Sequence, residues 1–387
     1  MKTVLTSVGT SLITNYMTDI GKYADLIRDM KNRGFDKLYL ENNKRIINEL
    51  KSELSEFLNS DLTVSAETTS ILKFLDKIKS QIYIVPITTD TIESNICAEI
   101  ISDYLKKIDN IFVSDSILIE GLQVKDNKKF LREGMPKLLA RLDKYGAQSE
   151  VYLNFTGGYK GTIPYLTLWA QVNNVKMFYL YEESDDIIEV PQAPIDISWN
   201  VFAKYESLLS RLEEGIEISK EEFLRKNNLI NTDFPDIIDE IDEDGVKLIS
   251  LNHIGAIFLS RFRRFHVFYI PENSKYLSEE PNKKNNVNLA VAALIERLNS
   301  LDSDYNKLND DILKHHVYGD GSAIYKFKKM DTQIRIHYKW DNPKLVVYNY
   351  QFVQSKSDDK EYSDKFRKEF DNYKKSKLIS VTILKEN

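Results

Sequence analysis

Short apolar segments alternate with helix-patterned segments over the first 190 residues, and this alternation constrains the fold of the chain most strongly. Four apolar segments have the length of buried strands: 3–8, 82–86, 151–155 and 177–181. Helical patterns lie between and around them, at 42–58, 95–108, 129–145 and 163–172. Strands that alternate with helices predict an α/β fold, with a parallel sheet between two layers of helices.

Two of these predicted strands end in glycine-containing turns that lead into a helix. Gly9-Thr10-Ser11 follows the first strand, and residues 154–162 (NFTGGYKGT) follow the third. In an open parallel sheet, ligands bind at the carboxyl ends of the strands. Glycine lets backbone N–H groups approach an anion, and a helix N-terminus favours negative charge. With Lys160 as a cation, the two turns predict an anion site, although ordinary turns between strands and helices remain the alternative.

These turns and the segment Ile119-Glu120-Gly121-Leu122-Gln123 resemble the CARF (CRISPR-associated Rossmann fold) sensor family over residues 1–190. The resemblance implies a Rossmann-like domain that forms a homodimer and binds a cyclic oligoadenylate across the two-fold axis. Cyclic tetra-adenylate is the expected activator, but the sequence leaves the ring size open. The ligand contacts implied by the resemblance are Gly9, Thr10, Ser11, Thr88, Asn154, Thr156, Gly157, Gly158, Tyr159 and Lys160. Thr89, Asp90 and Ser94 are expected on the floor, and Lys160 is suited to a weak ring-nuclease activity.

The chain is expected to contain three domains, at 1–195, 196–270 and 285–387. Prolines 191 and 194 mark the first boundary. Predicted helices at 205–212, 219–227 and 235–242, followed by a wing strand at 245–250, are typical of a winged helix-turn-helix. Residues 201–255 carry 6 basic and 13 acidic side chains, so attraction to DNA phosphates is not expected. A linker or dimerising module is predicted, with a transcription regulator as the alternative.

The charge is distributed unevenly along the sequence. Residues 314–387 hold 16 Lys and Arg against 10 Asp and Glu, while the rest of the chain holds 37 against 49. This distribution indicates that only the C-terminal region meets a polyanion.

The C-terminal region is predicted to end in an antiparallel meander. A loop is expected at 272–288, and a helical region at 289–316. Strand patterns follow at 324–327, 333–340 and 344–352, separated by short polar turns. The mainly antiparallel pattern distinguishes this region from the alternating first half.

The segment from Tyr318 through Lys356 resembles RelE-like toxin ribonucleases, which implies an α+β domain that cleaves mRNA, on the ribosome in the expected case. RNA cleavage by the neighbouring 2′-hydroxyl needs a base, an acid and a cation on the phosphate. Strand alternation places Arg335 and His337 on one face. The expected catalytic residues are Arg335 as phosphate stabiliser, Lys326 and Lys328 on the RNA backbone, Lys356 as a second phosphate ligand and His337 as acid or base. One of Lys326 and Lys328 is an alternative candidate for the base.

Two other nuclease classes fit the sequence less well. Arg261 and His266 have the spacing of a HEPN ribonuclease, but HEPN domains are all-helical and this region is predicted to contain strands. A metal-dependent nuclease needs a Glu-x-Lys strand, which is missing, and Asp331 and Asp341 lie in predicted turns. A messenger-degrading enzyme with a structural C-terminal region is a third alternative.

The favoured interpretation is a cyclic-oligoadenylate-activated, metal-independent endoribonuclease (mRNA interferase) of type III CRISPR immunity, without a cofactor. The chain has one cysteine, Cys97, and the start MKTVLTSVGTSL lacks the features of a signal peptide. It also has no apolar stretch long enough to span a bilayer. A cytoplasmic protein is therefore expected.

Overall fold

The computed structural model describes residues 1–31, 33–123, 126–146, 148, 150–181, 184, 186–194, 199–214, 218–226, 237–243, 245–301, 305, 310–329, 332–341, 344–353 and 359–385. Internal contacts divide the chain into two compact units. The first unit is Met1–Ile195 with Asn252–Ile257, and the second is Asp196–Leu251 with Phe258–Asn387. The division into three domains stays a prediction.

The first unit is built on a mostly parallel sheet with the strand order β3-β2-β1-β5-β6-β7, and β4 pairs with β2 beside β3. The strands are β1 Lys2–Val8, β2 Ile82–Thr89, β3 Ile111–Val113, β4 Ile117–Ile119, β5 Val151–Asn154, β6 Lys176–Leu180 and β7 Ile187–Val190. Only β7 runs antiparallel to its neighbour among these pairs. The α/β class and the four predicted strands are confirmed.

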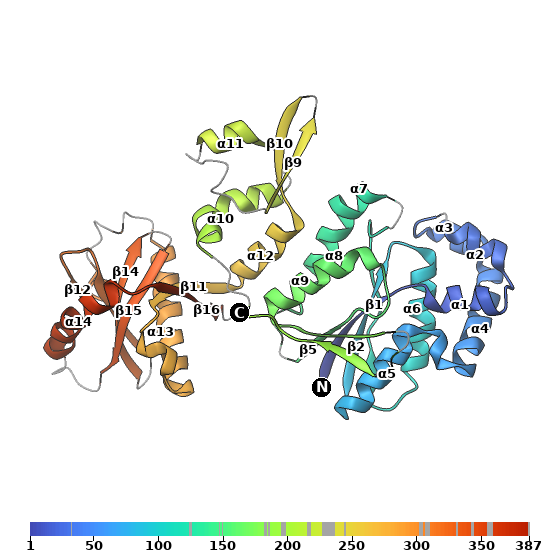
Figure 1. Ribbon diagram of the computed structural model, residues 1–387, viewed down its shortest axis with the longest axis horizontal. Coiled ribbons are helices and arrows are strands. Elements are labelled where there is room, and N and C mark those ends of the chain that lie inside the picture. Colours follow the sequence, from blue (N-terminus) through green and yellow to red (C-terminus); the bar gives the residue numbers. More distant parts are fainter. Residues whose placement is uncertain are drawn as a thin grey trace. The chain divides into compact units, whose positions relative to one another are not determined.

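Helices cover both faces of this sheet (Figure 1). Val4 and Ile84 lie in the core that includes residues of α1, α4, α5 and α6. Ile87 and Leu153, on the opposite face, border a small cavity together with Leu138 of α8 and Leu166 of α9. The helices are α1 Ser11–Asp19, α2 Ala24–Lys31, α3 Lys37–Asn42, α4 Lys44–Ser60, α5 Ala66–Ile78, α6 Ile92–Leu105, α7 Asn127–Lys129, α8 Met135–Leu142 and α9 Ile163–Asn173, with the short helices η1 Leu62–Val64, η2 Phe130–Gly134 and η3 Lys160–Thr162.

The second unit begins with a small three-stranded sheet, ordered β8-β10-β9. Its elements are α10 Asn200–Glu213, β8 Ile218–Ser219, α11 Lys220–Lys226, β9 Ile238–Glu243 and β10 Val246–Leu251. The helix predicted at 235–242 is wrong, because residues 238–243 form β9, and residues 235 and 236 lie outside the described part. β9 pairs with β10 along its whole length through a turn at Gly245, whose φ is 82°. Gly245 allows the tight turn, because glycine adopts positive φ readily. The pairing of β9 with β10 therefore prevails over the helical pattern of residues 235–242.

The rest of the second unit is a six-stranded mixed sheet, ordered β12-β13-β14-β15-β11-β16. The predicted antiparallel meander β13-β14-β15 is confirmed. β11 extends it by pairing parallel with β15 and antiparallel with β16. Helix α12, His253–Arg263, begins in the first unit and ends in the second. The other elements are β11 Phe265–Pro271, η5 Lys275–Ser278, α13 Pro281–Asn299, β12 His316–Val317, β13 Ala323–Lys329, β14 Thr332–Asp341, β15 Lys344–Phe352, α14 Asp359–Lys374 and β16 Leu378–Leu384.

Two predicted boundaries in this region are wrong. The loop at 272–288 contains the start of α13, which begins at Pro281, and proline is well suited to a first helical position. The helical region at 289–316 ends at Asn299, and His316 lies in strand β12. β11 and β16 are strands that the sequence analysis did not predict.

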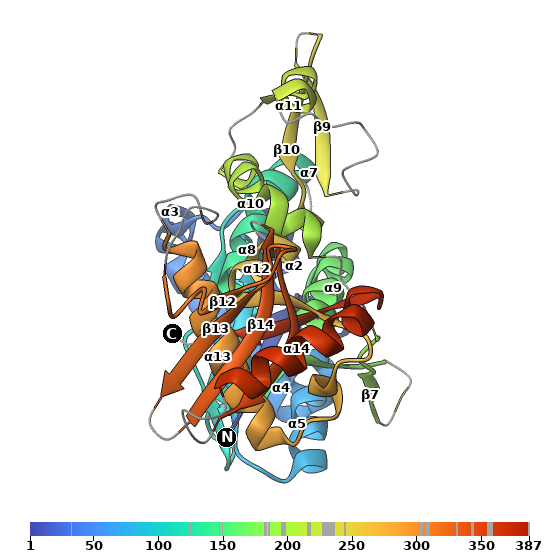
Figure 2. The ribbon, with the colours of Figure 1, turned by 90° about the vertical axis from the view of Figure 1, so that its left-hand side faces the viewer.

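The two helices α13 and α14 lie on opposite faces of the six-stranded sheet (Figure 1, Figure 2). α13 packs on the face that carries Ile334 and Ile336. Tyr362 and Phe366 of α14 pack with Ile324 on the other face. Within the part of the chain that the structure describes, no helix is long and apolar enough to cross a membrane.

Candidate functional site

The two glycine turns of the first unit lie against each other. β1 and β5 are neighbouring parallel strands, with Thr6 opposite Asn154, so the turns that follow them reach the same edge of the sheet. A Cβ atom built on Gly9 would lie 2.7 Å from the backbone nitrogen of Gly158. This separation is too short for any side chain at Gly9, so the glycine permits the close approach of the two turns.

The carboxylate of Glu67, near the start of α5, fills the space between these turns. Its Oε1 accepts a hydrogen bond from the Gly9 N–H at 2.7 Å, and its Oε2 accepts one from the Ser11 hydroxyl at 2.8 Å. The Ser65 hydroxyl also donates to Oε2, at 3.2 Å. Glu67 is 1% exposed. The negative charge lies at the N-terminus of α1, where the helix dipole favours an anion.

The sequence analysis expected Gly9 and Ser11 to bind an anionic ligand. In the structure, the Glu67 carboxylate takes that position. An acidic side chain in the first turn of a helix is a common capping feature, so the sequence offered no signal that Glu67 reaches a turn 58 residues earlier in the chain.

Several other predicted contacts are bonded within the protein. The buried Asn154 amide donates to Ser70 Oγ at 2.8 Å and its Oδ1 accepts from the Thr156 hydroxyl at 2.7 Å. The Thr88 hydroxyl donates to Asn95 Oδ1 at 3.0 Å, and the Ser94 hydroxyl donates to the Val8 carbonyl at 2.8 Å. Asn154, Thr88 and Ser94 are buried, so in this structure they hold the turns and the floor in place.

A cavity of about 920 Å³ lies beside the turns, with Lys160 at its edge. Five of the predicted ligand residues line it: Gly9, Thr10, Gly158, Tyr159 and Lys160. Thr89 and Asp90 of the predicted floor are also in the lining. The sequence analysis missed Arg28, Lys31, Arg33, Gly34, Thr91, Glu93 and Gln123. The lining thus holds four cationic side chains and two carboxylates, a balance that favours an anionic ligand.

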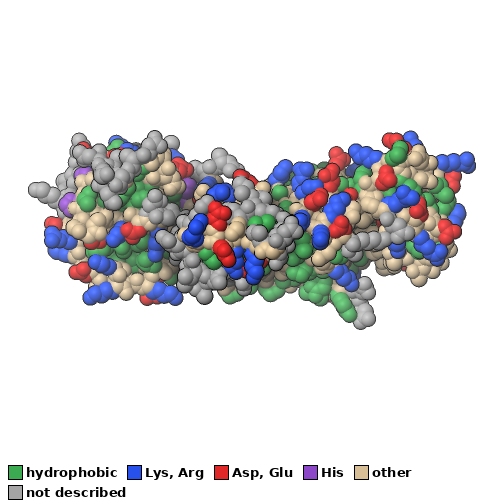
Figure 3. Space-filling view, turned by 90° about the horizontal axis from the view of Figure 1, so that it is seen from above, with side chains coloured by type: hydrophobic (Ala, Val, Ile, Leu, Met, Phe, Trp, Pro, Cys, Tyr) green, Lys and Arg blue, Asp and Glu red, His purple; other side chains and the backbone are tan. Residues whose placement is uncertain are grey.

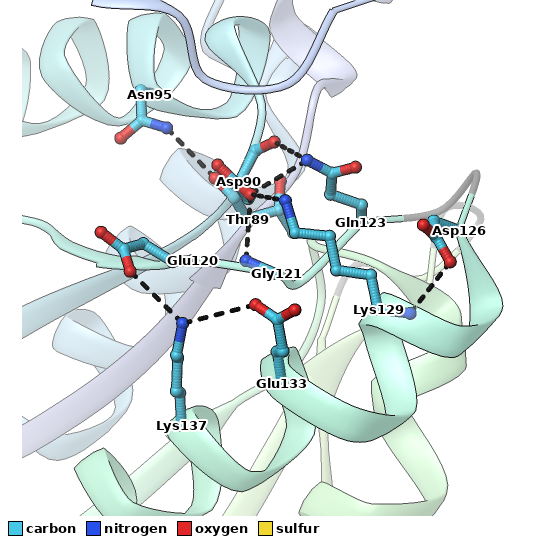
Figure 4. Close-up of polar contacts among 10 residues, drawn as sticks. All are labelled: Thr89, Asp90, Asn95, Glu120, Gly121, Gln123, Asp126, Lys129, Glu133 and Lys137. Atoms are coloured by element: carbon cyan, nitrogen blue, oxygen red, sulfur yellow. Dashed lines mark hydrogen bonds and ion pairs between the residues drawn. The ribbon is translucent and has the colours of Figure 1, made fainter.

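The floor of the cavity is tied to the segment 119–123 through Asp90 (Figure 4). Asp90 Oδ2 accepts hydrogen bonds from the Gly121 N–H and from Gln123 Nε2, each at 2.9 Å, and Lys129 Nζ lies 3.5 Å away. Gly121 has φ of 84°, and a Cβ there would lie 2.8 Å from Glu133 Cβ. The glycine in this segment is therefore required by the backbone and by the packing of η2.

The first unit is thus a doubly wound α/β domain with a cation-rich cavity at the carboxyl edge of its parallel strands. Residues 62–193 match the model of a family described as CRISPR-associated protein (Cas_APE2256). The matched segment contains Glu67, Asp90, Gly121 and the whole turn 154–162. This part of the chain is therefore similar to a CRISPR-associated family.

In the second unit, the structure brings four of the predicted catalytic residues onto one face of the meander: Lys326, Lys328, Arg335 and His337. Lys326 of β13 lies directly opposite Arg335 of β14, and opposite residues in an antiparallel pair share a face. His337 is two residues beyond Arg335 on the same face, before a bulge between His337 and Tyr338. Lys328 is exposed two residues from Lys326. Lys356 lies outside the described residues.

Helix α14 covers much of this face, which the sequence analysis did not anticipate. Arg335 is 8% exposed; its Nε donates to the Tyr362 hydroxyl at 3.4 Å, and its guanidinium lies 5.6 Å from the Tyr362 ring centre. Asn349 Nδ2 donates to Glu369 Oε2 of α14 at 2.5 Å. The Arg335 guanidinium is therefore held beneath α14, while Lys328 remains at the surface.

His337 is part of the core under α14. It is 1% exposed, and its ring stacks on Phe366 with centroids 5.7 Å apart. Its Nε2 lies 2.9 Å from the Ser322 hydroxyl. Burial lowers the pKa of His337 to about 4, against a smaller opposing effect of Asp320. This burial does not favour the expected role of His337 as an acid or base near neutral pH, and that role stays a prediction.

Tyr338 is a core residue. It is fully buried and faces α13; its hydroxyl donates to the Leu313 carbonyl at 2.9 Å and accepts from the Tyr305 hydroxyl at 2.9 Å.

Figure 3 shows acidic and basic side chains interspersed over both units on the face that it draws. The charge difference along the sequence therefore does not produce one uniformly basic face in this view.

The HEPN alternative does not fit the structure. Arg261 lies in the last turn of α12, with its guanidinium over the Phe265 ring at 3.4 Å, and His266 lies in strand β11. The unit around them contains a six-stranded sheet, which an all-helical fold lacks.

Among the described residues, no three His, Cys, Asp or Glu side chains are grouped closely enough to hold a metal ion.

Proposed function

We propose that the first unit binds a cyclic oligoadenylate and that this binding activates metal-independent RNA cleavage by the second unit, as part of CRISPR immunity. The observation that carries the proposal is the cation-lined cavity beside Gly9, Thr10 and Lys160, part of whose lining, including Lys160, belongs to the segment 62–193 that is similar to a CRISPR-associated family. A cyclic oligoadenylate presents a ring of phosphates to such cations, and it presents adenines to the polar groups around Asp90.

Glu67 has a defined part in this proposal. Because its carboxylate already satisfies the Gly9 N–H and the Ser11 hydroxyl, the turns are held in place before a ligand arrives. The phosphates would then meet Thr10 and Lys160 at the cavity surface. A preorganised site loses less conformational entropy on binding than a disordered one.

The second unit supplies groups suited to cleavage by the 2′-hydroxyl. In this reaction the 2′-oxygen attacks phosphorus, the 5′-oxygen leaves, and a 2′,3′-cyclic phosphate forms. Arg335 and the opposite Lys326 would stabilise the negative charge that develops on the phosphate oxygens. Lys328 would hold the RNA backbone. mRNA, bound to the ribosome, is the expected substrate.

The test is an RNA-cleavage assay with excess EDTA, with cyclic tri-, tetra- and hexa-adenylate added in turn. We expect cleavage with one ring, cyclic tetra-adenylate being the expected one, and little without it. Lys160→Ala should raise the messenger concentration that activation requires, whereas Arg335→Ala should reduce cleavage by about 100-fold or more at every messenger concentration. Equal cleavage with and without every ring would refute messenger control, and cleavage only with magnesium would refute the metal-independent mechanism.

Two further parts of the proposal have their own tests. A homodimer formed by the first unit would bind one ring per two chains, which light scattering and calorimetry measure together. Weak ring-nuclease activity would appear as slow loss of the messenger, dependent on Lys160. Loss of RNA cleavage in Lys160→Ala but not in Arg335→Ala would favour a messenger-degrading enzyme instead.

A further inference from the structure

A second cavity, of about 520 Å³, lies in the second unit beside α13. It is lined by residues of β11, α13 and β13 and by the end of β16, including His266, Leu289, Phe327 and Lys385. The predicted catalytic residues Lys326, Lys328 and Arg335 are not in its lining. It is therefore a different place from the face beneath α14.

His266 is the buried polar group of this cavity. It is 5% exposed, and β11 places it opposite Ile383 of β16. Its Nε2 is buried without a hydrogen-bond partner among the described residues, although the Glu296 carboxylate lies 3.5 Å away. Buried polar atoms are almost always hydrogen-bonded to protein, water or a ligand. The imidazole nitrogen in this cavity wall thus has one long contact, to an exposed carboxylate, and no short hydrogen bond among the described residues, which leaves a position that a ligand atom can fill.

The charges around the cavity favour an anion. Lys329, from β13, and Lys385, after β16, are both exposed in the lining, against one carboxylate, Glu296 of α13. Burial lowers the pKa of His266, and Lys385 lowers it further, while Glu296 opposes them. An anion bound between the lysines would stabilise the imidazolium and raise this pKa.

One wall of the cavity is apolar, and the polar side chains of Asn285, Asn288 and Thr382 lie elsewhere in the lining. Leu289, Ala292 and Ala293 of α13 lie in the lining together with Phe327 of β13. A cavity of this size with one apolar wall and a few polar groups is typical of small-molecule sites. Inorganic phosphate would leave that wall exposed to water, whereas a nucleotide would cover it with its base.

We propose that this cavity binds a nucleotide phosphate, with Lys329, Lys385 and His266 on the phosphate and the α13 wall against the base. The proposal does not depend on the messenger or on the cleavage mechanism. The phosphate belongs either to a free mononucleotide or to the end of an RNA strand.

The experiment uses the full chain without messenger, with ¹³C-labelled histidine, titrated with inorganic phosphate, adenosine, 5′-AMP and a 5′-phosphorylated tetraribonucleotide. The chain has 5 histidines, and His266→Asn assigns the resonance of His266. We expect 5′-AMP or the tetraribonucleotide to shift this resonance saturably and to raise its pKa by about one unit. The tighter ligand of the two identifies the source of the phosphate.

Substitutions separate the site from general charge effects. Lys385→Ala and Lys329→Ala should each weaken binding by about 10-fold, because each removes a charged hydrogen bond to the phosphate. Lys368→Ala, an exposed lysine of α14, should leave the affinity unchanged. Both lysine substitutions are at exposed positions and their affinities are measured by calorimetry, so this part of the test holds even if His266→Asn fails to fold. No saturable shift of His266, equal binding of adenosine, or equal loss in Lys368→Ala would overturn the proposal.

Discussion

Substitution of Gly157 by alanine tests whether Glu67 fixes the two turns of the first unit. The added Cβ would lie 1.9 Å from Glu67 Oε1 and 2.4 Å from its Cδ, far inside contact distance. Gly157 is not among the residues with positive φ, so alanine itself causes no backbone strain. The carboxylate must therefore move from its place between Gly9 and Ser11, or the turn must shift.

The expected loss of folding free energy has two sources, overpacking and the loss of hydrogen bonds to Glu67. Overpacking a tightly filled position costs about 1–3 kcal/mol. Displacing a carboxylate from its donors costs about 1.5–3 kcal/mol for each charged hydrogen bond that is lost. We expect Gly157→Ala to lower the free energy of unfolding of the first unit by about 3 kcal/mol. In a Glu67→Ala background the same change should cost less than about 1 kcal/mol, which leaves a coupling energy of about 2 kcal/mol.

The assay is urea denaturation followed by the fluorescence of Trp169, which is fully buried in the first unit. Trp199 and Trp340, in the second unit, are replaced by Phe in every variant, so that the signal reports the first unit alone. Glu67→Gln is the matched control, because it keeps the shape of the side chain and should keep the clash with the methyl group that Gly157→Ala introduces. Equal costs of Gly157→Ala in the wild-type and Glu67→Ala backgrounds would refute the reasoning.

Three further predictions concern charge and pH. Lys160→Ala should weaken binding of the cyclic oligoadenylate by about 10-fold and reduce its salt dependence, as measured by calorimetry at two salt concentrations; unchanged affinity would contradict the assignment. The pKa of His337 is about 4 in the folded chain and about 6.5 when unfolded, so the unfolded state takes up a proton first as the pH falls. The second unit should therefore lose up to about 3 kcal/mol between pH 7 and pH 4, and His337→Phe should remove that loss in denaturation followed by Trp199; an identical pH profile would contradict it. Arg335→Ala should reduce messenger-activated RNA cleavage by about 100-fold or more with unchanged messenger binding, measured on the same preparation; a parallel loss of binding would show that the substitution disturbs more than cleavage.

The sequence predicted those features that depend on local pattern. The strands before Gly9 and Asn154 have clear apolar runs, and the turns contain glycine where backbones must approach closely. The meander strands alternate, so the shared face of Arg335 and His337 followed from their spacing, whereas the position of Lys326 opposite Arg335 depends on the strand register. In each case, a short segment of the chain contains the information.

The features that the sequence did not predict depend on distant segments. Glu67 meets Gly9 and Gly157 only when α5 packs against the sheet, and α14 covers Arg335 only after the meander has formed. β11 was missed because its partners, β15 and β16, lie far along the chain. β9 was mistaken for a helix because its acidic residues between isoleucines fit both periods, and only pairing with β10 decides between them.

Glu67 and α14 each contact, inside the protein, residues that the sequence analysis expected to contact a ligand or RNA. Gly9 and Ser11 are held by Glu67, so substitution of either residue would disturb the turns of the first unit, whereas Arg335 makes a long hydrogen bond, to Tyr362, that its replacement would remove. Lys160, Lys328 and Lys385 are exposed, and replacing them removes charge with little loss of packing. A ligand that binds these exposed lysines gains its charge interactions without displacing internal hydrogen bonds. Affinity should therefore follow the exposed cations, while the buried polar groups determine the stability of the surfaces that carry them.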